Sequence, residues 1–198
     1  MLRNGNDRKQ PSEAGSLEAV DGSSPGWNAR MKYIWYGFFI LVQCTWGFFQ
    51  TLAGFVVFLI HAGKPHAFFR GCISTKWDSG SGLSLGLFLF SPDESCYGRL
   101  KYPNETKEQF DGRCGMILVH EYGHAMQSFV LGPFHLIPGI CSFGWAHLKR
   151  YVELRRKYGV PYSYCWVEHW ANVWGEKATG LPSIGRLEMP EAYGPLQS

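Results

Sequence analysis

The sequence has little net charge for a chain of 198 residues. Its 19 Lys and Arg stand against 16 Asp and Glu, a formal balance of +3, whereas a nucleic-acid-binding domain would show a clustered basic face. Nucleic acid is therefore not an expected partner. The mean hydropathy of −0.15 excludes a transporter with many membrane spans, but it allows one or two.

The cysteines lack the spacing that would make them metal ligands. None of the six forms a CxxC pair, which excludes a zinc ribbon, and in a chain of this length they do not suggest a disulfide framework. Cys72, Cys96 and Cys114 lie in one polar region, where a bridge between two of them stays open.

Residues 33–60 contain no Asp, Glu, Lys or Arg. Because about 20 apolar residues span a bilayer, this run predicts a tilted transmembrane helix within residues 30–63. The aromatic content of 16% with eight Trp is in keeping with a membrane interface. A buried core helix is the alternative, which the length of the uncharged run disfavours. Basic residues lie on both sides, so the sequence does not predict an orientation.

The rest of the chain predicts a compact α+β domain at residues 64–182, mainly helical, between a disordered tail at 1–29 and an extended tail at 183–198. Residues 66–92 predict a small β-hairpin, and residues 91–112 a loop. A helix is expected from Arg113 to Gly132-Pro133. The apolar segment 133–145 is short for a span, so it predicts a re-entrant or interfacial segment, or the end of a kinked membrane helix over 115–145. Residues 146–159 predict a basic helix on an anionic surface, and a last helix ends near Gly180.

The stretch HEYGH at residues 120–124 places three titratable side chains in an apolar helix. His120 and His124 share a helix face and can bind one ion, while Glu121 can reach a water that the ion polarises. Gly123 allows another segment to approach this helix closely. A catalytic zinc site needs a third protein ligand, and no histidine at position 127 or 130 supplies one.

Glu168, in the sequence WVEHWAN, is the best candidate for the third ligand. On a helix, Glu168, Ala171 and Asn172 share a face, so Asn172 can hydrogen-bond a ligating histidine from behind. His169, His147 and His135 are alternative ligands. If Glu168 is no ligand, a surface pair with Lys177 or Arg155 is expected.

HEYGH followed by E-x-x-A-N resembles the gluzincin zinc metallopeptidases, most closely the membrane-bound group that includes HtpX and the CAAX prenyl endopeptidases. The resemblance covers residues 116–128 and 166–175, and Asn172 stands where that family has Asp. It implies a minimal zincin-like core with Zn²⁺ on His120, His124 and Glu168, and with Glu121 as catalytic base. By the same analogy, an extended substrate pairs with the strand in LSLGLFLFSP, although that strand could equally serve packing alone. Arg186 and Tyr193 are the candidates for stabilising the oxyanion.

These expectations describe a membrane-anchored zinc metallopeptidase with its catalytic domain close to a lipid bilayer. Its substrate would be a peptide or protein, which can itself be membrane-associated. The alternative is a noncatalytic metal-binding scaffold or pseudoenzyme, which Asn172 favours. A site-2-type intramembrane protease is disfavoured, because that family places an Asp in a later apolar segment and no Asp follows Asp111.

Overall fold

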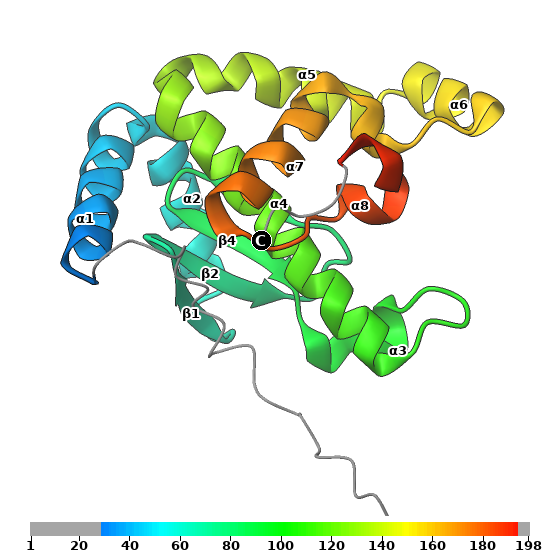
Figure 1. Ribbon diagram of the computed structural model, residues 1–198, viewed down its shortest axis with the longest axis horizontal. Helices are drawn as coiled ribbons and strands as arrows, with labels where there is room; N and C mark the ends of the chain where they lie inside the picture. Colours follow the sequence, from blue (N-terminus) through cyan, green and yellow to red (C-terminus); the bar gives the residue numbers. More distant parts are fainter. Residues whose placement is uncertain (1–28, 194–198) are drawn as a thin grey trace, which may run out of the picture.

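The computed structural model describes residues 29–193, so the tail expected at residues 1–29 lies outside the described residues except for Ala29. Helices dominate, and a small mixed sheet packs against the long helix α4 (Figure 1). The predicted mainly helical α+β class is confirmed. The elements are α1 Ala29–Thr45, α2 Phe48–Ile60, β1 His66–Phe69, β2 Cys72–Trp77, β3 Leu83–Leu85, β4 Phe88–Pro92, η2 Glu94–Cys96, α3 Tyr97–Leu100, α4 Lys107–Leu131, η3 Gly132–His135, α5 Leu136–His147, α6 Lys149–Tyr158, η4 Tyr162–Tyr164, α7 Trp166–Thr179, α8 Gly185–Glu188 and η5 Pro190–Ala192.

The sheet has four strands in the order β1-β2-β4-β3, where one hairpin was expected. The expected first strand is split by a turn at Arg70 and Gly71, whose φ angles are 51° and 94°, and the second is split at Gly86, with φ 61°. Each of the two expected strands therefore forms an antiparallel hairpin of its own, β1–β2 and β3–β4. The two hairpins join through β2 and β4, which run parallel. This arrangement makes β3 an edge strand.

The uncharged run 33–60 forms two helices that meet at 96°, not the single helix expected. Buried carboxamides explain the bend. Gln43 donates from Nε2 to the Ala125 carbonyl at 2.9 Å, and Gln50 donates to the Gly132 carbonyl at 2.8 Å. At Gly47, a Cβ would lie 2.2 Å from Gln43 Oε1. The two glutamines of the run therefore face α4 and η3, whereas most of its apolar side chains are exposed.

Helix α4 starts earlier than predicted, at Lys107, because Thr106 and Gln109 form a reciprocal capping box that satisfies two backbone donors. It ends at Gly132 as expected, with φ 54°. The following apolar segment is helical (η3 and α5). Counted through η3, Lys107–His147 is the one described helix long and apolar enough to cross a membrane, and 11% of its apolar window is buried. The same test is passed by α1 and α2 only as a bent pair.

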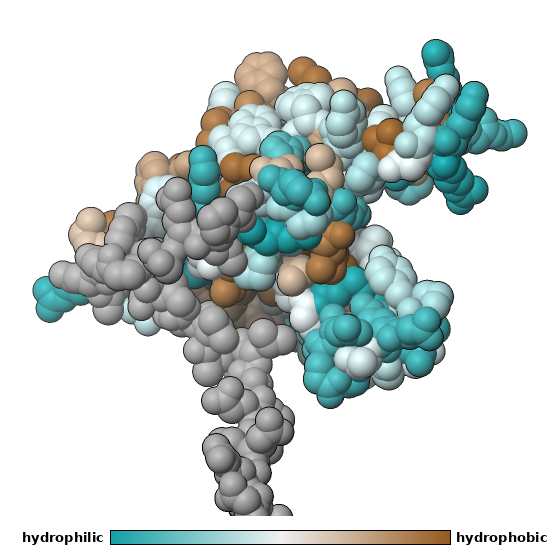
Figure 2. Space-filling view, turned by 45° about the vertical axis from the view of Figure 1, so that its right-hand side comes forward, coloured by the Kyte–Doolittle hydropathy of each residue, from teal (hydrophilic) through white to brown (hydrophobic). Residues whose placement is uncertain are grey.

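Apolar side chains gather on the outside of these helices. Figure 2 shows them along the upper part of the visible face, whereas the ends of the molecule near α6 and α3 are hydrophilic. Large exposed hydrophobic residues on α5 include Ile137, Ile140 and Phe143. The core lies between α1, the sheet and α4, where Phe39 stacks on Phe129 with ring centroids 5.2 Å apart.

Of the extended tail expected at 183–198, the structure describes residues 183–193, and these are not extended, since they contain α8 and η5. Arg186 makes an ion pair with Glu176 at 2.7 Å, and Gly185 packs against Asn172 and Tyr193. These contacts fold the segment back on α7. All six cysteines are free thiols, so no bridge joins Cys72, Cys96 and Cys114.

Candidate metal centre

Two antiparallel helices bring the candidate ligands together. Gly123 of α4 faces Ala171 of α7, and Gly175 of α7 faces Val119 of α4. A Cβ on Gly123 would lie 1.8 Å from the Ala171 carbonyl oxygen, so the helix backbones touch at this point. The close approach expected at Gly123 is confirmed.

His120, His124 and Glu168 meet beside this contact. Glu168 Oε2 lies 3.1 Å from His120 Nε2 and 3.6 Å from His124 Nε2. One ligand atom from each residue lies within 4.8 Å of the other two. Glu168 is 1% exposed, and it lies on the buried face of α7, not in a surface pair with Lys177 or Arg155. These three residues can therefore hold one metal ion.

Backbone groups fix the tautomers of both histidines. The Gly185 N–H donates to Asn172 Oδ1 at 3.2 Å, so this oxygen accepts from His120 Nδ1, which lies 2.9 Å away. Gln127 Nε2 donates to the Val167 carbonyl, and its Oε1 accepts from His124 Nδ1 at 2.8 Å. With both Nδ1 atoms protonated, both neutral rings present an Nε2 lone pair to Glu168. Gln127 was not recognised in the sequence, although it lies one helical turn after His124.

Three acceptors that face one another need a cation between them. Glu168 Oε1 is also buried without a hydrogen-bond partner. In the metal-free protein a proton takes this place: burial lowers the pKa of His124, but Glu168 and Glu121 outweigh burial and raise it to about 9. Burial opposes ionisation of Glu168, yet the two histidines hold its pKa far below the ordinary value. The donor set of two imidazoles and one carboxylate fits zinc.

The comparisons with known proteins found no match among protein-family models, curated proteins or solved structures. The structure places His120 and His124 on the long helix α4 and Glu168 on α7, and together they form a largely buried group that is consistent with an HExxH-like site.

Glu121 lies beside the triad but contributes no atom to it. Its carboxyl contacts Gly82, where a Cβ would lie 2.1 Å from Oε1, at the start of edge strand β3. Burial raises the pKa of Glu121, while His120 and His124 lower it. A carboxyl whose pKa is raised in this way is suited to accept a proton and return it.

The alternative third ligands lie elsewhere. His147 is on the exposed end of α5, where its Nδ1 contacts the Phe143 carbonyl, and His169 contacts the Tyr193 hydroxyl at 3.2 Å. His135 comes closest, with its ring centroid 6.3 Å from that of His124, but it is no member of the triad. Its Nδ1 is buried without a partner.

The two expected oxyanion residues do not face the triad. Arg186 is paired with Glu176, and Tyr193 lies near His169 and Asn172. Tyr162, which the sequence did not indicate, is within electrostatic reach of the site. Burial, together with Glu168 and Glu121, raises its pKa, so the hydroxyl keeps its proton and can donate. The signal in the sequence was weak, because Tyr162 precedes α7 in a Tyr-rich turn.

A second acidic group, Asp78, Asp93 and Cys96, is close enough to hold an ion, but its charges are already compensated. Lys64 pairs with Asp78 at 2.8 Å, and Asp93 caps the short η2 helix through the Ser95 N–H. Asp78 is exposed. The buried triad is therefore the candidate functional centre.

Proposed function

We propose that the chain is a membrane-associated zinc peptidase that hydrolyses peptide bonds at the centre formed by His120, His124 and Glu168. One observation carries the proposal: three acceptor atoms converge beside the buried carboxyl of Glu121. A structural zinc site would be closed by four protein ligands. Three ligands next to an unused carboxyl are typical of a catalytic site.

Each residue has a distinct task in this proposal. When bound, zinc supplies Lewis acidity that brings the pKa of a water to about 7. Glu121 accepts the proton of the attacking water and returns it to the leaving amine. Tyr162 donates a hydrogen bond to the oxygen on which negative charge develops. Asn172 and Gln127 keep the histidine Nε2 atoms directed at the ion.

The substrate is proposed to be an extended peptide lying along β3. This strand is one of the two edge strands of the sheet, and the preceding Gly82 contacts Glu121. A peptide that adds to this edge by backbone hydrogen bonds would pass the catalytic carboxyl. Because β3 has three residues, it could align about one scissile bond and its neighbours.

The association with a bilayer is proposed from the exposed apolar surfaces of α1, α2 and α5. Monomeric soluble proteins rarely expose large contiguous apolar patches, and here Trp46 of the α1–α2 bend contacts Phe134 of η3, with ring centroids 6.2 Å apart. This contact joins the apolar surface of α1 and α2 to that of η3 and α5. The substrate can then be a membrane-associated peptide or protein.

A metal-binding scaffold without catalysis is the second candidate, and Asn172 favours it. A neutral amide raises the basicity of His120 less than a carboxylate does. The two candidates differ in whether Glu121 has a chemical task.

Replacing Glu121 by Gln tests the proposal. The Glu121→Gln variant should retain about one zinc per chain by metal analysis but lose cleavage of a peptide library by about two to four orders of magnitude. Glu108→Gln makes the same change in the exposed first turn of α4 and should alter neither property. Glu168→Ala should reduce zinc binding itself.

Cleavage that survives Glu121→Gln would contradict the assigned chemistry. Wild-type protein with full zinc occupancy and no cleavage of library or membrane-associated substrates would instead support the scaffold.

A further inference from the structure

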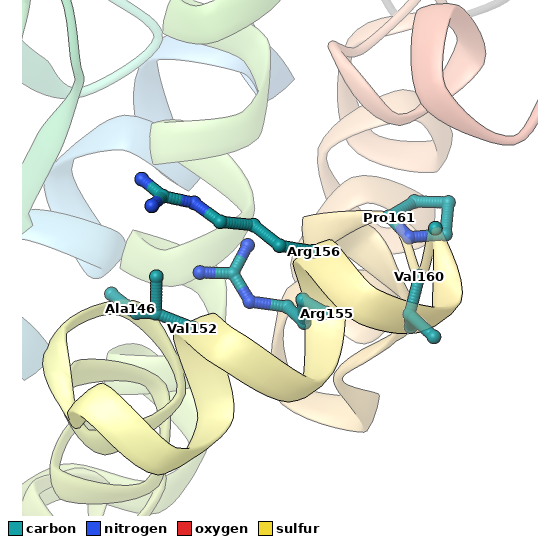
Figure 3. A pocket seen from close by; sticks show the side chains of 7 residues that line it. Ala146, Val152, Arg155, Arg156, Val160 and Pro161 are labelled. Atoms are coloured by element: carbon teal, nitrogen blue, oxygen red, sulfur yellow. The ribbon is translucent and has the colours of Figure 1, made fainter.

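A cavity of about 460 Å³ lies at the junction of α5 and α6 and contains no residue of the metal centre. Apolar side chains form much of its wall, and two arginines supply its charge. It is lined by Ala146, Val152, Arg155, Arg156, Gly159, Val160 and Pro161. Figure 3 shows the Arg155 and Arg156 side chains extending side by side in the same direction.

Arg155 is held in place by aromatic rings. Its guanidinium lies 5.4 Å from the ring centroids of both Trp145 and Tyr162, and Trp145 Nε1 donates to the Tyr162 carbonyl at 2.9 Å. Cation–π contacts of this kind fix the plane of the guanidinium. Its Nε is nevertheless buried and has no hydrogen-bond partner among residues 29–193.

The charge around the cavity is uncompensated. Helix α6 carries Lys149, Arg150, Arg155, Arg156 and Lys157 against a single acid, Glu153. Glu153 lies 3.8 Å from Lys149 at the other end of the helix. Within the described part of the chain, no ion pair of Arg155 or Arg156 with a carboxylate is present. An unsatisfied buried donor costs about 1–3 kcal/mol, so a ligand that accepts from it is favoured.

We propose that this cavity binds the phosphate group of an anionic phospholipid. Two adjacent guanidiniums match the oxygen atoms of a phosphate, which a forked donor binds at two points. The helices that form the cavity also carry exposed apolar side chains, Phe143 on α5 and Leu154 on α6, and Leu148 between the two helices is exposed as well. A lipid whose phosphate contacts Arg155 and Arg156 can lay its acyl chains over this surface. A free anion would use the arginines but leave the apolar surface uncovered.

The test uses the detergent-solubilised full chain and native mass spectrometry to measure bound lipid. Phosphatidylglycerol, phosphatidylcholine and inorganic phosphate serve as separate probes. The wild type should bind one phosphatidylglycerol molecule in preference to phosphatidylcholine. The double variant Arg155→Gln/Arg156→Gln should weaken this binding by about tenfold or more. The control Lys149→Gln/Arg150→Gln removes the same charge from the same helix outside the cavity and should change it by less than about twofold.

Two further variants separate recognition from folding and from charge. Arg156→Gln alone leaves the Arg155 ring contacts intact and should still weaken binding. Arg155→Lys keeps the charge but loses the forked geometry, and it should also weaken binding. Equal losses in the two double variants, equal affinity for both lipids, or displacement of the lipid by inorganic phosphate at comparable concentration would each overturn the proposal.

Discussion

At the scale of single residues, two carboxamides determine what the centre can bind. Asn172 and Gln127 accept from the Nδ1 atoms of the two histidines, and backbone groups of Gly185 and Val167 set the direction of each amide. Held this way, both histidines direct Nε2 at Glu168, where a metal ion can replace the proton that His124 binds in the metal-free protein. The amides therefore make the centre ready to bind a cation.

Replacing Asn172 by Asp tests how much the amide limits the centre. The new carboxylate would keep accepting from His120 and Gly185, and the Ser163 hydroxyl, now 3.2 Å from Asn172 Nδ2, can turn to donate. The Asn172→Asp variant should bind zinc about tenfold more tightly, because a carboxylate raises imidazole basicity. The metal-free variant should melt at a lower temperature, because it buries an additional charge. Competition with a chromophoric chelator measures the affinity, with Asn172→Ala as the control that should weaken it, and weaker binding by the Asn172→Asp variant would contradict this account.

The sequence indicated part of this centre and not the rest. The shared face of His120 and His124 follows from helix geometry alone. A hydrogen bond from a ligating histidine to Asn172 was expected once Glu168 was placed on a helix, but the sequence did not indicate that this histidine is His120. That Glu168 meets the histidines came from a family resemblance, since no local rule predicts how α7 docks on α4. Tyr162 and Gln127 were missed because their tasks depend on that docking.

At the scale of elements, the contact between α4 and α7 requires glycine. At Gly123 and at Gly175, a carbonyl group of the other helix occupies the space that a Cβ would fill. With the helices this close, Glu168 Oε2 lies 3.1 Å from His120 Nε2. For the sheet, the β-rich runs of the sequence predicted where strands would form. Their parallel pairing through β2 and β4 was not predictable, because it depends on which strands α4 covers.

Two glycines of α4 offer a matched comparison of this requirement. A Cβ at Gly123 would overlap the Ala171 carbonyl, whereas one at Gly115 meets nothing within 4 Å. Gly123→Ala should destabilise the protein by about 1–3 kcal/mol and weaken zinc binding by about tenfold or more. Gly115→Ala should stabilise it by up to about 1 kcal/mol and leave zinc binding unchanged. Urea unfolding and metal titration give both quantities, and a Gly123→Ala variant with wild-type zinc affinity would show that the helices can separate without loss of the centre.

At the scale of the whole molecule, the exposed apolar surface of α5 is followed directly along the chain by the basic helix α6. The sequence predicted one tilted membrane-spanning helix in the run 33–60, but it could not show that Gln43 and Gln50 turn inward to α4 and η3 and that the run bends. The surface proposed to meet the lipid is thus shared by α1, α2 and α5. Each of α1 and α5 carries one exposed cysteine, Cys44 and Cys141, so the chain contains its own probes of this surface.

Labelling of these two thiols should decide whether the surface lies in lipid. Each variant retains only one of Cys44, Cys141 or Cys96, and the other five cysteines, including the buried Cys72 and Cys114 that urea would expose, are replaced by alanine. A thiol reacts as the thiolate, which hydrocarbon disfavours. A water-soluble maleimide should therefore label Cys44 and Cys141 more than about tenfold more slowly in phospholipid vesicles than in urea. Cys96, partly exposed beside Asp78 and Arg99, should react at comparable rates in both. Rapid labelling of Cys44 and Cys141 in vesicles would place α1 and α5 in water and remove the membrane from the proposed function, whereas protection of Cys141 alone would assign the lipid contact to α5 and the arginine cavity beside it.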